Sequence, residues 1–253
     1  MVTLSYSKDA IYKYRFILTS DFTIQTVALT EQERIDLAAN ETLTVSSVDS
    51  TGVAAVVVTF ADANLKTTLG SGQATAINND GPSTLTETHF WIAPDGRALS
   101  TYNGGSLPDD PVMFGVAADA RFVSAVLPDG AVKPGDTWTK NYDVPSSSGA
   151  GSIQVIAKSS YLRNETFGGV EVAVVETVST ANVDIGIKGS SSILGTANSD
   201  VTSWIDPSAH RIVKTMVTSS SELSMAASPI GSLVPGARPF TQKGTQTLDL
   251  EPA

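Results

Sequence analysis

Two parts of this sequence repeat the same series of β-type signals, and this repetition is the strongest constraint on the fold. A valine-rich run after a glycine-containing turn occurs at residues 53–60 and again at residues 170–178. A Trp-Ile-x-Pro turn follows each run, beginning at Trp91 and at Trp204, so the valine-to-tryptophan separations are 38 and 34 residues. Matches in the same order and at similar spacing predict an internal duplication.

The rest of the chain has the same β character. Short runs rich in Val, Ile, Thr and aromatic residues are separated by Gly, Pro, Asn and Asp, as in sheet proteins. Tyr12, Tyr14, Phe16 and Leu18 alternate with polar residues, which predicts a strand with one buried face. The chain has 30 serines and 28 threonines and only 17% charged residues, which fits a sheet with hydroxyl groups on its exposed face. We therefore predict a mainly β protein.

The duplication predicts three parts of the chain: a first repeat at residues 1–107, a connecting or covering segment at residues 108–131, and a second repeat at residues 132–253. In the connecting segment, Asp110 is a candidate N-cap, and Pro111 suits the first turn of a helix that runs to about Val126. This helix is the candidate cover of the sheet.

A second helix signal competes with a strand at residues 30–33. The sequence Thr-Glu-Gln-Glu matches a capping box ahead of Ile35 and Leu37. The segment also takes the place of a strand in the repeat, and Asn40 leads directly into a β run. We favour a long polar strand here.

Charge and hydropathy exclude several classes of partner. The net charge of −10 disfavours nucleic acid, because phosphate binding needs clustered Lys and Arg. The longest apolar run has six residues, at 53–58, whereas a transmembrane helix needs about 20. The first eight residues lack the apolar region of a signal peptide. The chain has no cysteine, so it has neither disulfides nor thiolate metal sites.

The sequence contains none of the usual catalytic signatures. It has no nucleophile elbow, no zinc-protease helix and no phosphate-binding glycine loop. Its two histidines, His89 and His210, lie in a predicted strand and after a predicted turn. We expect no catalytic residue, no metal site and no cofactor; a hydrolase that uses either histidine is the enzymatic alternative.

Large apolar side chains suggest a binding site instead. In the strand at residues 89–93, Phe90 and Ile92 point to one face and His89 and Trp91 to the other, so both faces need a cover. A groove between the sheet and its cover would accept an acyl chain or another apolar ligand. Its candidate lining residues are Trp91, Met113, Phe114, Phe122, Trp204, Met225 and Leu233.

The chain resembles the LolA/LppX-like bacterial lipoprotein fold over residues 53–60, 91–97, 170–178 and 204–214. The segment at residues 127–138 is similar to one in uncharacterised secreted bacterial proteins with two such halves. The resemblance implies a duplicated antiparallel half-barrel with a short helical or loop cover, a location outside the cytoplasm, and carriage of lipids or lipoproteins. It implies no catalytic residues. The chain departs from the family in lacking a lipobox cysteine.

Two functions follow as hypotheses. In the first, the protein is a non-enzymatic, extracytoplasmic (periplasmic, cell-surface or secreted) protein that binds a hydrophobic small molecule or lipid between a curved sheet and its cover. In the second, it is a structural or adhesive surface protein that self-associates through its sheet edges.

Overall fold

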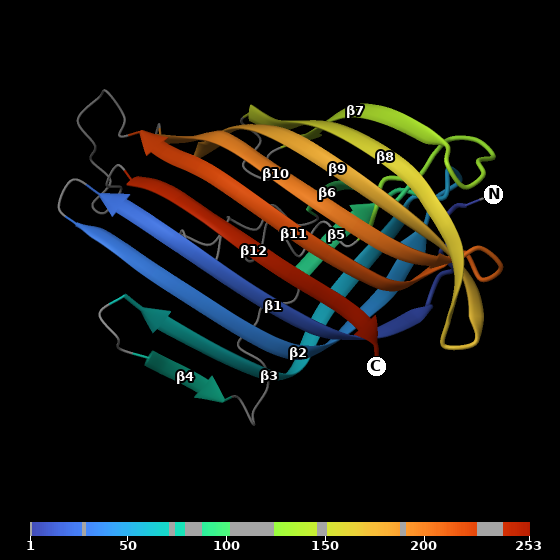
Figure 1. The fold of residues 1–253 in the computed structure, drawn as a ribbon, viewed down its shortest axis with the longest axis horizontal. Helices are drawn as coiled ribbons and strands as arrows, with labels where there is room; N and C mark the ends of the chain where they lie inside the picture. The colour runs from blue at the N-terminus through green and yellow to red at the C-terminus, as the bar shows by residue number, and fades with distance from the viewer. Residues whose placement is uncertain are drawn as a thin grey trace.

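The computed structural model describes residues 2–26, 29–70, 74–78, 88–101, 124–145, 151–187, 191–226 and 240–253. These residues form twelve strands and no helix, so the prediction of a mainly β protein is confirmed (Figure 1). The strands are β1 (Ile11–Thr26), β2 (Thr30–Val48), β3 (Ala54–Leu69), β4 (Ala74–Asn78), β5 (Thr88–Ile92), β6 (Ala98–Thr101), β7 (Thr137–Pro145), β8 (Gly151–Phe167), β9 (Val170–Ile187), β10 (Ser191–Asp206), β11 (Arg211–Ala226) and β12 (Phe240–Pro252).

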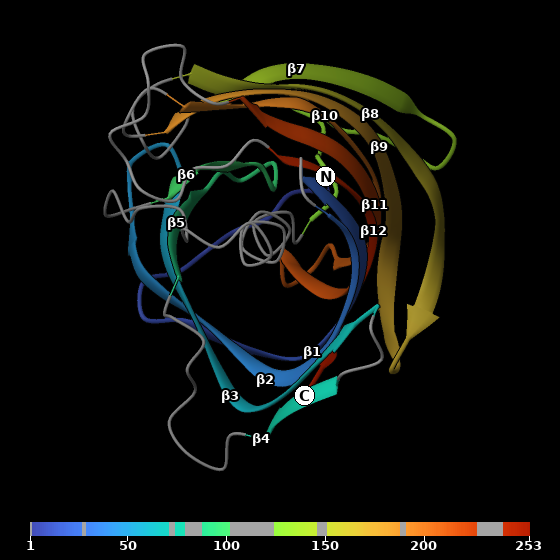
Figure 2. The ribbon, with the colours of Figure 1, turned by 90° about the vertical axis from the view of Figure 1, so that its left-hand side faces the viewer.

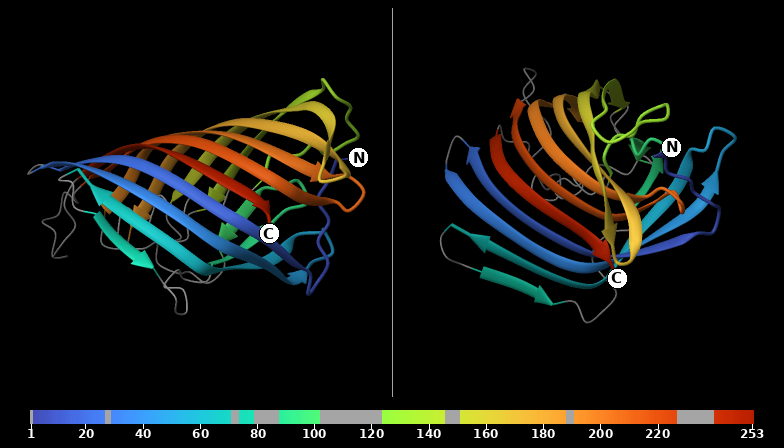
Figure 3. Two further views of the ribbon diagram at one scale, coloured as in Figure 1. Left: turned by 60° about the horizontal axis from the view of Figure 1, so that its bottom comes forward. Right: turned by 45° about the vertical axis from the view of Figure 1, so that its right-hand side comes forward.

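All of these strands belong to one antiparallel sheet. Its order is β6-β5-β3-β2-β1-β12-β11-β10-β9-β8-β7, and β4 lies off this path against the second part of β3. The end strands β6 and β7 approach each other but do not pair, so the sheet is open. It curls strongly, which gives it a concave inner face and a convex outer face (Figures 2 and 3).

The first and last strands join the two parts of the chain. β1 pairs with β12 from Tyr14–Pro252 to Thr26–Phe240. On one side of β12 the strand order is β6-β5-β3-β2-β1, and on the other side it is β11-β10-β9-β8-β7. Read across the sheet from β6 to β7, the strands follow one another in descending chain order on both sides of β12. This arrangement is compatible with duplication of residues 1–107 and 132–253, which stays a prediction.

The core lies on the inner face, towards the end of the sheet that holds the β2–β3 and β5–β6 turns. Inward positions alternate with outward ones along β1 and most of β2, as the sequence pattern predicts for residues 12–18. Burial of each large apolar side chain contributes about 2 kcal/mol. The largest fully buried side chains come from both halves of the chain and include Phe16, Leu18, Val45, Val56, Phe90, Ile92, Ile205, Leu248 and Leu250.

The polar segment at residues 30–33 is a strand. β2 begins at Thr30 and runs to Val48, with Glu31, Gln32 and Glu33 opposite Ile24, Thr23 and Phe22 of β1. The predicted strand is confirmed, and the alternative helix is wrong. The reason is tertiary: β1 lies alongside this segment and takes its backbone hydrogen bonds, which outweigh the local preference of a capping box.

Residues 124–127, at the described end of the predicted cover, do not form a helix. We call this segment the strap. Residues 124–127 have no regular secondary structure and are buried, whereas the prediction has a helix running to about Val126. The N–H of Ala125 donates to Ser203 Oγ at 2.9 Å, and the N–H of Val126 donates to Thr177 Oγ1 at 2.8 Å. Because sheet side chains accept these bonds, the strap does not need helical ones. Residues 108–123 lie outside the described part of the chain.

The turn at residues 93–97 packs directly on this strap. The N–H of Leu127 donates to the carbonyl oxygen of Asp95 at 2.9 Å. Gly96 has a φ of +85°, and a Cβ there would lie 2.8 Å from the carbonyl oxygen of Ala125. Glycine is therefore required by both the turn and the close approach.

Lys140 ties the end strand β7 to the β5–β6 turn. Its Nζ lies 2.7 Å from a carboxylate oxygen of Asp95 and 2.7 Å from one of Asp129, and its side chain is only 12% exposed. Arg97 also pairs with Asp95 at 2.7 Å, and its guanidinium lies 5.2 Å from the ring centre of Tyr142 on β7. These contacts hold the two ends of the open sheet together.

Replacing Lys140 by methionine should destabilise the protein by about 1–3 kcal/mol, because Asp95 would keep a largely buried charge with only Arg97 as partner. Denaturant unfolding measures the loss. The control is Lys243→Met, which removes an exposed pair with Glu222 and should cost less than about 1 kcal/mol. Equal losses in the two variants would contradict the role of Lys140.

Replacing Thr177 by valine should cost about 1–3 kcal/mol, because the buried N–H of Val126 would lose its acceptor with almost no change in side-chain volume. Thr180→Val, on the outer face of the same strand, is the matched control and should be near neutral. Thermal unfolding of both variants checks this, and an unchanged midpoint for Thr177→Val would show that the strap does not depend on the hydroxyl.

Candidate functional site

Beyond the core, the inner face carries a polar row across five neighbouring strands. Ser20 of β1 lies opposite Gln246 of β12, which lies opposite Ser219 of β11. Ser219 lies opposite Ser199 of β10, and Ser199 lies opposite Ser179 of β9. Directly opposed residues on one face have Cβ atoms about 5 Å apart, so these side chains form a continuous row.

The next inward position, two residues away along β9, β10, β11 and β12, is occupied by a small residue. This small row consists of Gly244, Ser221, Ala197 and Ala181, in register with Phe22 of β1. A Cβ at Gly244 would lie 2.2 Å from the ring of Phe22, so the absence of a side chain there lets the ring lie across β12.

Apolar side chains border both rows. On the core side lie Leu18, Leu248, Val217 and Val201, which are buried. On the other side lies a separate apolar cluster of Val183, Ile193 and Leu223, against which Ile153 packs.

The two rows are partly accessible on β9, β10 and β11, whereas Ser20 and Gln246 on β1 and β12 are buried. On β9, β10 and β11 the serines and alanines of both rows are half-buried, whereas the core positions next to them are buried. Because these side chains are short, the sheet does not fill the space on its inner face there by itself. A concave surface with apolar borders and a polar centre is the kind that takes small-molecule ligands.

The predicted tryptophans are not part of this surface. Trp204 lies between Ser203 and Ile205, which point inward, so its own side chain is on the outer face. There its Nε1 donates to Glu165, and Lys214 Nζ lies 5.5 Å from its ring centre. Trp91 likewise lies on the face opposite to Phe90 and Ile92. The structure therefore does not place either tryptophan in an inner groove.

Met225 is the one predicted lining residue that the described structure places inward. It lies two residues after Leu223 on β11, opposite Ile193, at the border of the apolar cluster. Met113, Phe114, Phe122 and Leu233 lie outside the described residues. The rows themselves were missed, although short side chains at every second position are visible in the sequence, as in Gly195, Ala197 and Ser199.

The N-terminal residues close the core end of the inner face. The N–H of Leu4 donates to the carbonyl of Pro94 at 3.0 Å, and the N–H of Ser5 donates to the carbonyl of His210 at 2.9 Å. These acceptors belong to the β5–β6 and β10–β11 turns, which lie in different halves of the sheet. Val2 and Leu4 are buried there. The segment therefore links the two halves and covers the core.

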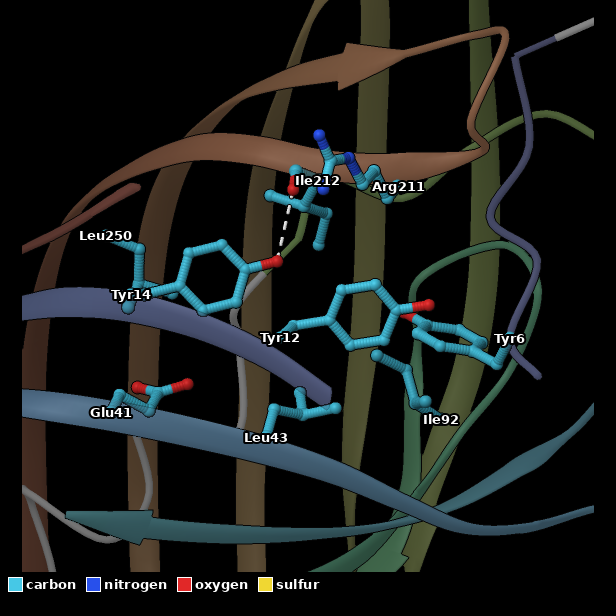
Figure 4. A pocket seen from close by; sticks show the side chains of 9 residues that line it. All are labelled: Tyr6, Tyr12, Tyr14, Glu41, Leu43, Ile92, Arg211, Ile212 and Leu250. Carbon is cyan, nitrogen blue, oxygen red and sulfur yellow. Dashed lines mark hydrogen bonds between the residues drawn. The ribbon is translucent and has the colours of Figure 1, made fainter. Parts of the chain in front are cut away.

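A small cavity lies beneath this segment (Figure 4). Its volume is about 20 Å³, which is room for about one water molecule and far too small for a lipid. Tyr14 donates from its hydroxyl to the carbonyl of Ile212 at 3.1 Å. The cavity is lined by Tyr6, Tyr12, Tyr14, Glu41, Leu43, Ile92, Arg211, Ile212 and Leu250.

Glu41 is the unusual member of this cavity. Its side chain faces the core from β2 and is 2% exposed. Burial raises its pKa to about 8, because the charged form loses hydration. Burial also raises the pKa values of Tyr6 and Tyr14, and for Tyr14 the nearby Glu41 adds to the shift. The carboxyl group is therefore neutral over most of the physiological pH range.

Stability should fall as pH rises because of Glu41. The folded protein keeps the proton up to about pH 8, whereas the unfolded chain releases it near pH 4.5. Stability from this group is therefore complete below about pH 4.5, declines by up to about 1.4 kcal/mol per pH unit between these values, and is constant above about pH 8. The glutamine variant, which mimics the neutral acid, should remove this part of the pH dependence.

Unfolding midpoints of the native protein and Glu41→Gln between pH 4 and pH 9 test this. We expect the variant to be more stable than the native protein at pH 9 and close to it at pH 4. Glu171→Gln, at an exposed position, is the control. Parallel pH profiles for native and Glu41→Gln proteins would contradict the buried, protonated carboxyl.

Among the described residues, no group of three or more His, Asp or Glu side chains is arranged to hold a metal ion. His210 lies in the β10–β11 turn, and its Nδ1 is 3.2 Å from Thr3 Oγ1 in the N-terminal segment. No helix in the described part of the chain is both long and apolar enough to span a membrane.

Comparison with known proteins gives little beyond this geometry. No family model matches the sequence, and no curated protein does either. Among solved structures, the chain is similar to lipovitellin, in a structure concerned with lipid–protein interactions, with a TM-score of 0.46 and 14% sequence identity. The match covers 98% of this chain, which spans only 25% of the lipovitellin chain.

Proposed function

We propose that the protein binds an apolar ligand, a lipid or lipid-like molecule, against the inner face of its curved sheet. The observation that carries the proposal is the accessible surface formed by the small row and the polar row between two apolar borders. Burial of an acyl chain there would remove apolar area from water at about 25 cal/mol per Å². The water-sized cavity near Glu41 is not this site.

The proposal includes a non-enzymatic role outside the cytoplasm. The resemblance to LolA/LppX-like proteins at residues 53–60, 91–97, 170–178 and 204–214 supports the location. The contacts of His210 support the absence of catalysis by this residue, because they are those of a turn that anchors the N-terminal segment.

Self-association through sheet edges is the second candidate. In the described structure β6 pairs only with β5 and β7 only with β8, so each has one edge without a strand. Such edges accept strands from other molecules. The Lys140–Asp95 contact works against this, because it draws the two end strands of the same sheet together.

Native mass spectrometry of protein purified from a lipid-containing host, before and after organic extraction, tests both candidates. We expect a monomer that carries a discrete extra mass, which extraction removes. A bare monomer that takes up no lipid after incubation with mixed lipid vesicles would overturn ligand binding, and a ladder of multimers would favour self-association.

A matched pair of variants places the ligand. Ala197→Phe adds a large ring to the small row on the inner face of β10, and Asn198→Phe adds the same ring to the exposed outer face one residue later. The first variant should lose most of the bound mass and the second should keep it. Circular dichroism should show that both retain the sheet. Equal retention of ligand by the two folded variants would mean that binding occurs elsewhere.

A further inference from the structure

The polar row contains two buried groups with unused hydrogen-bonding capacity. Ser20 is fully buried and Gln246 is 6% exposed. Within the described part of the chain, neither Ser20 Oγ nor Gln246 Oε1 has a hydrogen-bond partner. The two residues are directly opposed on β1 and β12 and both point to the inner face.

Unpaired buried groups of this kind are costly. A buried donor or acceptor without a partner costs about 1–3 kcal/mol. Replacement by alanine or leucine would avoid this cost, and the neighbouring inward positions, Leu18 and Leu248, are apolar. These two polar groups beside the apolar core therefore offer hydrogen bonds that a ligand on the inner face would complete.

The charge of the surrounding surface limits what that atom belongs to. The inward side chains of the polar row and the small row are all uncharged. Among the described residues, the nearest charged side chains at inward positions are the acidic Glu31 and Glu33, at the far end of β2 opposite Ile24 and Phe22. No cation on these rows is available to pair with a carboxylate or a phosphate, and the two glutamates would repel either.

We propose that Ser20 and Gln246 recognise an uncharged hydrogen-bonding group, such as a hydroxyl, ester or amide, on a ligand whose apolar chain lies on the inner face beside the polar row. The inference rests on the proposed function and narrows it to neutral amphipathic lipids. The Ser20 hydroxyl both donates and accepts, and the unpaired Gln246 Oε1 accepts, so the pair fits a ligand hydroxyl, which also both donates and accepts. Fatty-acid anions and phospholipids fit this surface poorly.

Three probes of equal chain length test the proposal: dodecan-1-ol, dodecanoate and dodecane. Each competes with N-phenyl-1-naphthylamine, whose fluorescence rises in apolar surroundings. On the full chain at pH 7.5 we expect dodecan-1-ol to displace the dye at concentrations about tenfold lower than either of the other probes, which corresponds to one well-placed buried hydrogen bond.

Variants separate recognition by the row from general apolar binding. Gln246→Leu keeps a similar volume and removes the amide, and Ser20→Ala removes the hydroxyl with the smallest change in size. Each should weaken dodecan-1-ol about tenfold and leave dodecane unchanged. Thr247→Val, an exposed outward position on the same strand, should change neither. If Gln246→Leu does not fold, Ser20→Ala carries the test.

The outcomes distinguish this inference from the function on which it rests. If the dye and all three probes fail to bind, the proposed function itself is overturned. If the probes bind with equal strength, or if dodecanoate binds best, the role of the polar row is overturned and apolar binding stands. If dodecan-1-ol binds best but the two variants bind it as the native protein does, the polar group is recognised elsewhere and the inference is also overturned.

Discussion

The pairing of β1 with β12 is the contact on which the rest of the structure depends. It joins strands from opposite ends of the chain, from Tyr14–Pro252 to Thr26–Phe240, and makes one sheet out of two sets of strands. Without it, each set would have a further open edge and half of a core. With it, Phe16 and Leu250 pack in the same cluster as Phe90 and Ile205, which come from strands on opposite sides of the junction.

Because the sheet is curved, the size of its inward side chains decides which part of its interior is filled. Large side chains fill the inner face at the end with the β5–β6 turn, where the strap and the N-terminal segment cover them. Serine, alanine and glycine further along the same strands leave the surface accessible. Polar groups are held differently in the two regions. The hydroxyls of Thr177 and Ser203 accept hydrogen bonds from the backbone of the strap, whereas Ser20 of the polar row faces the proposed ligand.

Local pattern was enough to predict much of the fold. The alternation at residues 12–18 and the opposite directions of Phe90 and Trp91 follow from a two-residue period, and the strand at residues 30–33 follows from its place in the repeat. The same period shows that Trp204 and Ile205 point to opposite faces, but it does not say which face is concave. The tryptophans were therefore assigned to the interior, where smaller residues line the surface instead.

The other differences share one physical cause, which is that residues distant in the sequence supply the partners that set the local structure. Residues 124–126 fit the end of a helix, but Ser203 and Thr177 accept the N–H groups of Ala125 and Val126, which therefore need no helical partner. The polar row likewise cannot be predicted from the order of residues in the chain, because Ser20, Gln246 and Ser219 come together only through the register of three strands.

The sequence by itself determined that the chain forms strands and which residues share a face, because these features depend on neighbours in the chain. The tertiary structure alone decided which face is concave, which strands meet, that Glu41 is buried in its neutral form, and where small and polar residues gather on the inner face. These depend on curvature and register, which are set by pairing between residues more than 200 positions apart in the case of β1 and β12.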